Sequence, residues 1–100
     1  MWNDEVILIK SIRYMDKTKN HRYKDKETRV LCKTSSISSS EFYRAAEQGF
    51  NPEINIVVHS YEYDGERRVR YKDVVYKVIR SYRASFEETE LVCEVAKGVN

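Results

Sequence analysis

The sequence predicts a mainly β protein: a small antiparallel barrel or sandwich with one short α-helix and a long charged hairpin loop. Apolar and polar residues alternate with a period of two through most of the 100 residues, as they do in strands with one buried face. Eight tyrosines and one proline favour strands, because aromatic side chains fit a pleated, half-buried surface. Strand and helix patterns do not alternate along the chain, which argues against a parallel sheet.

The N-terminal third predicts two strands joined by the long loop. Residues 5–13, EVILIKSIR, begin with an apolar run that is typical of a strand buried on both faces at its start. Residues 14–28 are mostly charged and polar and predict a hairpin loop. Extended structure resumes over residues 29–37, RVLCKTSSI.

A helical period replaces the alternation between Ser38 and Pro52. Ser38 stands three residues before Glu41, which is the spacing of a capping box. Gly49 suits the left-handed position that ends many helices, and Pro52 prevents continuation. The helix is therefore expected between the second and third strands.

The apolar positions of this helix indicate the face that contacts the sheet. Phe42, Ala45 and Ala46 are three and four residues apart, so they share one side. A helix of about three turns is marginal alone and must be stabilised by packing. We therefore expect Phe42 to anchor the helix on the sheet.

The C-terminal half predicts four more strands. They cover residues 53–63, 67–71, 74–83 and 89–96. Asp64-Gly65 is a strong turn pattern, and Lys72-Asp73 predicts a tight two-residue connection. Short strands at this spacing indicate a small barrel or sandwich, and the length indicates a single domain over residues 1–100.

The composition limits the classes of partner. Apolar residues make up 41% and charged residues 34% of the chain, as in globular proteins with a charged surface. The net charge of +2 is too balanced to indicate a nucleic-acid-binding protein by itself. No apolar run is long enough to span a bilayer, so we expect no membrane partner. Acidic residues precede the first apolar run, which argues against a secretory signal and favours cytoplasmic synthesis.

Catalytic and metal-binding patterns are weak. His21 and His59 do not form a metal-ligand pattern with cysteines or carboxylates. A nucleophilic pair of His59 with Ser60 or Cys93 would require the fold to bring them together. Three scattered glycines cannot form a phosphate-binding loop. We therefore predict that the protein is not an enzyme and uses no metal or cofactor.

The two cysteines, Cys32 and Cys93, each lie in an apolar strand pattern. Buried thiols that pack as small hydrophobic groups account for them. A disulfide or a metal pair is the alternative, which the absence of a C-x-x-C spacing disfavours.

Two features are candidate interaction surfaces. The first is the 14–28 loop, whose positive excess could be a solvated surface or could contact phosphates or an acidic protein. Its basic residues are Lys17, Lys19, Arg22, Lys24 and Lys26. The second is a mixture of basic and aromatic residues: Arg67, Arg68, Arg70, Tyr71, Tyr76, Arg80, Tyr82 and Arg83.

The basic and aromatic mixture has two interpretations. Bases stack on aromatic rings and phosphates contact cations in proteins that bind single-stranded nucleic acid. Alternatively, the tyrosines are half-buried and the arginines pair with the many glutamates. A small single-strand-binding barrel is therefore the alternative function.

The order and spacing of five segments resemble the phage head-tail joining family, whose members are also called head-closure or head-tail adaptor proteins. The first segment is the strand that begins at residues 4–8. The most telling is SSSEFYRAAE at residues 38–47, which is similar to the family's serine-rich start of a helix with an aromatic residue and an alanine. The others are the alternating strand that ends in VVHSYEY at residues 57–63, VRYKDVVYKVI at residues 69–79 and ELVCE at residues 90–94.

This resemblance implies a structural protein of a tailed bacteriophage or prophage, located at the head-tail interface of the virion and made in the bacterial host cytoplasm. Family members bind below the portal as a ring, close the DNA channel and provide the surface to which the tail docks. The implied partners are other copies of the chain, portal or connector proteins, a tail completion protein and packaged double-stranded DNA. In solution we expect a monomer or weak oligomer.

The resemblance also suggests roles for two groups of residues. Exposed helix residues and their serine-rich entry would contact neighbouring subunits or the connector: Ser39, Ser40, Tyr43, Arg44 and Glu47. The basic residues of the 14–28 loop, given above, would face the channel or its DNA. No reaction is implied.

Overall fold

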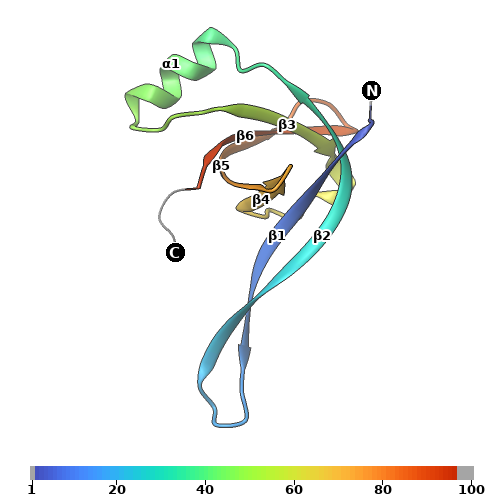
Figure 1. Ribbon diagram of the computed structural model, residues 1–100, viewed down its shortest axis with the longest axis vertical. Coiled ribbons are helices and arrows are strands. Elements are labelled where there is room, and N and C mark those ends of the chain that lie inside the picture. Colours follow the sequence, from blue (N-terminus) through green and yellow to red (C-terminus); the bar gives the residue numbers. More distant parts are fainter. Residues whose placement is uncertain (1, 97–100) are drawn as a thin grey trace.

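The computed structural model describes residues 2–96, and these fold into a closed six-stranded antiparallel barrel with one α-helix (Figure 1). The elements are, in chain order, β1 (Asp4–Met15), β2 (His21–Ser35), α1 (Ser39–Glu47), β3 (Ile54–His59), the 3₁₀ turn η1 (Ser60–Glu62), β4 (Arg68–Tyr71), β5 (Val74–Arg83) and β6 (Glu88–Val95). Around the barrel the strand order is β1-β2-β3-β6-β5-β4, and β4 pairs with β1 to close it. The predicted mainly β fold, with a helix after the second strand, is confirmed.

Alternate side chains along the strands fill the barrel interior. Leu8 on β1, Ile56 on β3 and Leu91 on β6 are completely buried. Val58 and Cys93 lie on the same inward sides of β3 and β6, as the alternation predicts. Each buried aliphatic side chain contributes roughly 1.5–3 kcal/mol relative to an exposed one, so this interior is the main source of stability.

Both cysteines belong to this interior. Cys32 on β2 and Cys93 on β6 are free and buried. Burial raises the pKa of the Cys32 thiol to about 11 and that of Cys93 to about 12, so both are protonated at neutral pH. The prediction of two buried thiols is confirmed.

A two-residue turn joins β4 to β5, as predicted. Lys72 has φ 50° and Asp73 has φ 66°, and a type I′ turn requires positive φ at both central residues. Tyr71 and Val74, which flank the turn, are partners in the strand register.

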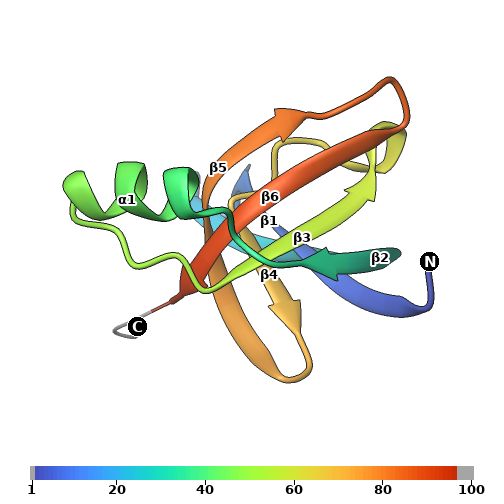
Figure 2. The same cartoon turned by 90° about the horizontal axis from the view of Figure 1, so that it is seen from above.

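The helix begins and ends where the sequence predicts. The Ser38 hydroxyl accepts a hydrogen bond from the Glu41 backbone N–H at 3.2 Å. Gly49 has φ 88° directly after the last turn, the left-handed conformation that a helix end favours. In Figure 2, α1 lies outside the barrel. Within residues 2–96, this structure contains no helix long and apolar enough to cross a membrane.

The predicted helix face is confirmed at Ala45 and wrong at Phe42 and Ala46. Phe42 is 41% exposed and does not anchor the helix, whereas Ala45 is buried. Glu41, one turn before Ala45, pairs instead with Arg80 of β5. The ion pair links the helix to β5, so Glu41 and Ala45 mark the inward face of the helix.

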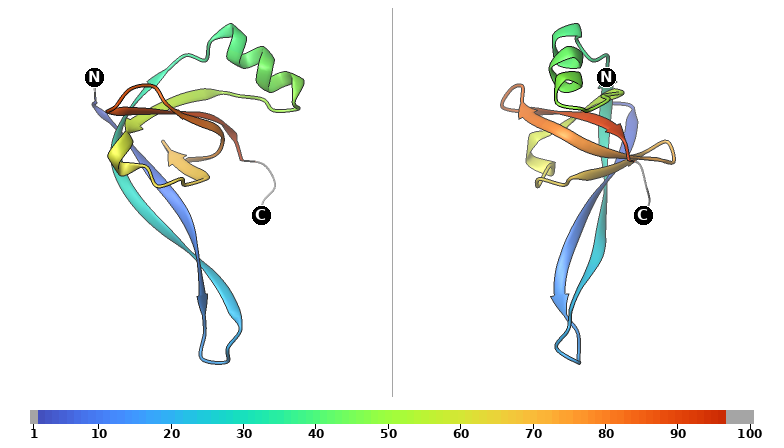
Figure 3. Two further views of the ribbon diagram at one scale, coloured as in Figure 1. Left: turned by 180° about the vertical axis from the view of Figure 1, so that it is seen from behind. Right: turned by 90° about the vertical axis from the view of Figure 1, so that its left-hand side faces the viewer.

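The prediction of a long loop over residues 14–28 is also wrong. β1 continues to Met15 and β2 begins at His21, so the connection is only residues 16–20. The two strands extend beyond the barrel as a twisted hairpin (Figures 1 and 3). A ribbon exposed on both faces does not need alternating apolar residues, so its sequence looks like that of a charged loop.

Candidate functional site

The projecting hairpin is the most distinctive surface of the molecule, and residues 10–26 are called the arm below. β1 pairs with β4 over Ile7–Ile9, and β2 pairs with β3 from Cys32 onward. Within the described chain, the register pairs from Lys10↔Lys26 to Met15↔His21 therefore form a two-stranded ribbon. The arm lies along the longest dimension of the molecule, 50 Å (Figure 1).

A carboxylate organises the tip of the arm. Asp16 Oδ1 accepts hydrogen bonds from the Thr18 and Asn20 backbone N–H groups, both at 2.9 Å, and from the Thr18 hydroxyl at 2.7 Å. Asp16 Oδ2 contacts Arg22 Nε at 2.5 Å. These bonds, the Arg22 contact first, lower the pKa of Asp16 to about 2. Arg22 therefore also stabilises the turn.

This tip should be sensitive to acid. The folded pKa of Asp16 lies below its ordinary value of 3.8, so its contribution to the turn is complete above about pH 4 and is lost as the pH falls toward 2. We expect an NMR titration of the Asp16 carboxyl carbon to have its midpoint near pH 2. In an Arg22→Gln variant the midpoint should rise, because the largest cause is removed. A midpoint at the ordinary value in the native chain would contradict this geometry.

One face of the arm is basic. Residues paired in register point to the same side of a two-stranded sheet. The pairs Lys10↔Lys26, Ile12↔Lys24 and Tyr14↔Arg22 therefore define a basic face, made of Lys10, Ile12, Tyr14, Arg22, Lys24 and Lys26. Lys24 Nζ lies 5.6 Å from the centre of the Tyr14 ring, and Lys10 Nζ contacts Asp64 Oδ2 of the barrel at 2.5 Å.

The opposite face holds the acids of β2. Asp25 Oδ1 contacts Arg68 of β4 at 2.7 Å, and Glu27, at the base of the arm, contacts Arg70 at 2.9 Å. Arg13 on this face donates from Nε to His21 Nδ1 at 3.2 Å. The structure thus separates charges that are mixed in the sequence. The predicted residues Lys17 and Lys19 lie exposed in the tip turn.

The helix is at the other end of the molecule (Figure 3). The predicted contact residues Ser39, Ser40, Tyr43, Arg44 and Glu47 are all exposed. Phe42 and Tyr43 make an edge-to-face pair, with ring centres 5.8 Å apart at 83°. Phe42 is an exposed aromatic group that the apolar pattern of the helix had placed against the sheet.

Three of the five arginines in the basic and aromatic mixture pair with carboxylates. Arg68 and Arg70 contact the acids of β2, and Arg80 contacts Glu41. The tyrosine hydroxyls donate to carboxylates as well, from Tyr71 to Asp4 at 3.0 Å and from Tyr82 to Glu90 at 2.6 Å. Tyr76 packs against the core. These strands therefore present fewer free cations than the sequence suggests.

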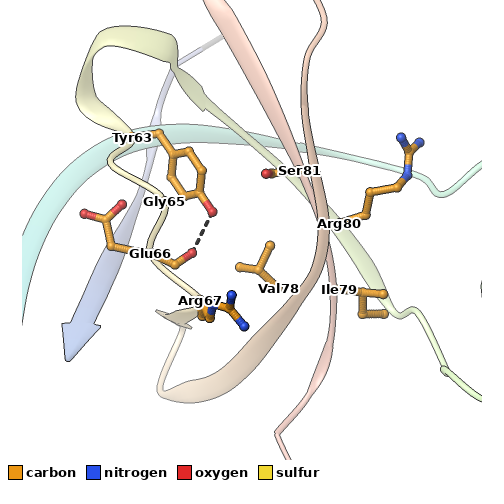
Figure 4. Close-up of a pocket in the computed structure, with 8 residues that line it drawn as sticks. All are labelled: Tyr63, Gly65, Glu66, Arg67, Val78, Ile79, Arg80 and Ser81. Atoms are coloured by element: carbon orange, nitrogen blue, oxygen red, sulfur yellow. Dashed lines mark hydrogen bonds between the residues drawn. The ribbon is translucent and has the colours of Figure 1, made fainter.

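A shallow hollow of about 320 Å³ lies beside the segment before β4 (Figure 4). Its lining residues are Tyr63, Gly65, Glu66, Arg67, Val78, Ile79, Arg80 and Ser81. The Tyr63 hydroxyl donates to the Glu66 carbonyl at 2.6 Å, and the Glu66 carboxylate accepts from the Asp64 N–H at 2.8 Å. The Tyr63 hydroxyl and the Glu66 carboxylate are thus already hydrogen-bonded to neighbouring backbone groups.

The candidate nucleophile pairs do not form. Cys93 is opposite Ile54 in the β3–β6 register, whereas His59 is opposite Glu88, so His59 and Cys93 are separated by five residues, roughly 17 Å along the strands. The Ser60 hydroxyl bonds to Thr89 at 2.8 Å, and His59 stacks on Trp2 with ring centres 3.9 Å apart. In the part of the chain that the structure covers, no three side chains of His, Cys, Asp or Glu are grouped as metal ligands.

Comparison with models of protein families gives no match, and comparison with curated proteins gives none either. The function is therefore inferred from the chain's own residues and geometry. The two surfaces that stand out are the arm and the exposed face of α1.

Proposed function

We propose that the chain is a structural protein of a tailed phage or prophage that joins the head to the tail. It binds below the portal or connector as a ring, closes the DNA channel and provides the docking surface for the tail through a tail completion protein. It is made in the bacterial cytoplasm and acts at the head-tail interface of the virion. It catalyses no reaction and needs no cofactor.

The observation that supports this proposal best is the arrangement of two unlike surfaces on one small barrel. The exposed face of α1 lies at one end, and the arm projects at the other (Figure 3). A ring of identical subunits is built from head-to-tail contacts, which require two different complementary surfaces on each copy. A head-tail joint also needs contacts above and below. The order of strands and helix is the one on which the resemblance to head-tail joining proteins rests.

In this proposal α1 contacts a neighbouring subunit or the connector. Tyr43 is 68% exposed beside Phe42, and exposed aromatic side chains are enriched at protein interfaces. Arg44 and Glu47 flank the aromatic pair with opposite charges and would set its orientation toward a partner. The serines at the helix entry, Ser39 and Ser40, complete this surface.

The alternative function is that of a small barrel that binds single-stranded nucleic acid. It would use the arginine and tyrosine strands, and five arginines in that region favour it. The ion pairs of Arg68, Arg70 and Arg80 with carboxylates weigh against it, because binding would have to break them. We therefore favour the head-tail joint.

The test is electron microscopy of particles from a lysogen in which this chain is deleted, with the native gene supplied in trans as the positive control. Heads that have lost their DNA beside complete, unattached tails are expected. Complementation with a Tyr43→Ala, Arg44→Ala variant should reproduce the defect, whereas Arg67→Gln on the barrel wall should restore virions. Normal virions from the deletion strain would refute the proposal.

A further inference from the structure

We propose that the basic face of the arm binds the phosphate backbone of duplex DNA. This inference rests on the proposed function only for the source of the DNA, which would be packaged DNA in the head-tail channel. The contact itself is inferred from the hairpin register, which places Lys10, Arg22, Lys24 and Lys26 on one face of the arm.

Charge is concentrated in the arm. Seven of the chain's 18 lysines and arginines lie in residues 10–26, against two of its 16 acids. The arm therefore has a net charge of +5 and the remaining residues a net charge of −3. The arm and the rest of the chain therefore differ in sign, although the whole chain is nearly neutral.

The register then concentrates the positive charge on one side. Lys10, Lys24 and Lys26 lie on the basic face with Arg22, which Asp16 neutralises. Asp25 lies on the opposite face, where Arg68 neutralises it. Lys10 and Lys26 are directly opposite each other, and like charges in that position are destabilising. Asp64 offsets the charge of Lys10. A polyanion bound along this face would relieve the remaining repulsion.

The shape of the arm suits duplex DNA. A two-stranded ribbon is narrow enough to enter the major groove. The arm extends roughly 20 Å for its six paired positions, and duplex DNA carries one negative charge per roughly 1.7 Å of its axis. The Tyr14 hydroxyl can donate to a phosphate beside the lysines, as tyrosines do in many protein–DNA contacts. These contacts would not depend on base sequence.

An acidic surface of a second copy fits the arm less well. The exposed acids outside the arm are Glu5, Glu27, Glu47, Glu53, Asp64, Asp73 and Glu87. Glu5, Glu27 and Asp64 are paired with Arg29, Arg70 and Lys10. The other four belong to α1, the segment before β3, the β4–β5 turn and the β5–β6 turn, so they do not form a stripe that matches the basic face. Duplex DNA offers continuous negative charge.

The test is an NMR titration of the 15N-labelled full chain with a 12-base-pair duplex at low and at high salt, because it resolves which residues bind and detects weak binding. We expect amide shifts that saturate at arm residues 10–14 and 22–26 and that vanish at high salt. Lys24→Gln, Lys26→Gln should weaken binding about tenfold or more and should make the salt dependence shallower by about 1.8 in log–log slope. Arg13→Gln, Arg67→Gln removes the same charge from positions off the basic face and should change affinity less than about threefold.

Three results would overturn the inference. The first is no shift at low salt with millimolar duplex. The second is stronger binding of a single strand, with shifts centred on β4 and β5. The third is shifts in the arm that depend on protein concentration without DNA, which would indicate a second copy as the partner. None of these tests head closure, which the deletion strain decides independently.

Discussion

A chain in which Asn-Gly replaces residues 13–23 is expected to fold into the same barrel but to yield heads that do not retain DNA. The Asp16 N–H bonds to the Asn20 carbonyl at 3.0 Å. Hydrogen-bonded pairs alternate along an antiparallel ladder, so Ile12↔Lys24 is again a hydrogen-bonded pair. A two-residue Asn-Gly turn fits such a position.

The barrel should tolerate this shortening. The deleted residues lie beyond the contact of β1 with β4, and Asp25, the partner of Arg68, is kept. The deleted Asp16–Arg22 pair joins two residues of the arm itself, so its loss should leave the free energy of unfolding of the barrel nearly unchanged. Thermal unfolding checks stability and electron microscopy of complemented particles checks function. Full virions with the shortened arm would show that the arm is dispensable.

Leu8→Ala is expected to cost about 3 kcal/mol of the free energy of unfolding, as is typical of Leu→Ala changes that leave a cavity. Leu8 is completely buried at the position where β1 pairs with both Val69 of β4 and Thr28 of β2. The cavity would therefore lie where the barrel closes. Urea unfolding followed by tryptophan fluorescence measures the change.

Leu31→Ala is the matched control, because it makes the same chemical change on the outer side of β2, where Leu31 is 46% exposed. It should cost less than about 1 kcal/mol. Equal losses in the two variants would mean that Leu8 does not lie in a packed interior.

Local patterns predicted the helix ends and the tight turn. Ser38 caps through its own side chain, and Gly49 and the Lys72-Asp73 pair adopt positive φ, which short-range sequence preferences describe. The inward sides of β3 and β6 also follow from their alternation. These features depend on residues a few positions apart.

What sequence reasoning missed depends on residues that are far apart. Arg68 meets Asp25, 43 residues away, and Arg80 meets Glu41, 39 residues away. The apolar pattern of the helix predicted that Phe42 faces the barrel. The pattern does not show that Glu41 pairs with Arg80, which determines the face that the helix turns toward β5. The arm was missed because its strands are exposed on both sides. Such strands lack the alternation of apolar and polar residues that indicates a strand.

The two buried thiols allow openings of the barrel to be detected by chemical labelling. A small alkylating reagent in solution can react with Cys32 or Cys93 only after the strands around them separate, because both side chains are completely enclosed and hold their protons at neutral pH. The labelling rate therefore counts openings of the barrel, and mass spectrometry can assign each opening to the β2 side or the β6 side. Separation of the two arm strands produces no labelling in the same experiment, because residues 10–26 contain no cysteine. The extent of labelling in a stored sample therefore measures how often its barrel has opened, independently of any opening of its arm.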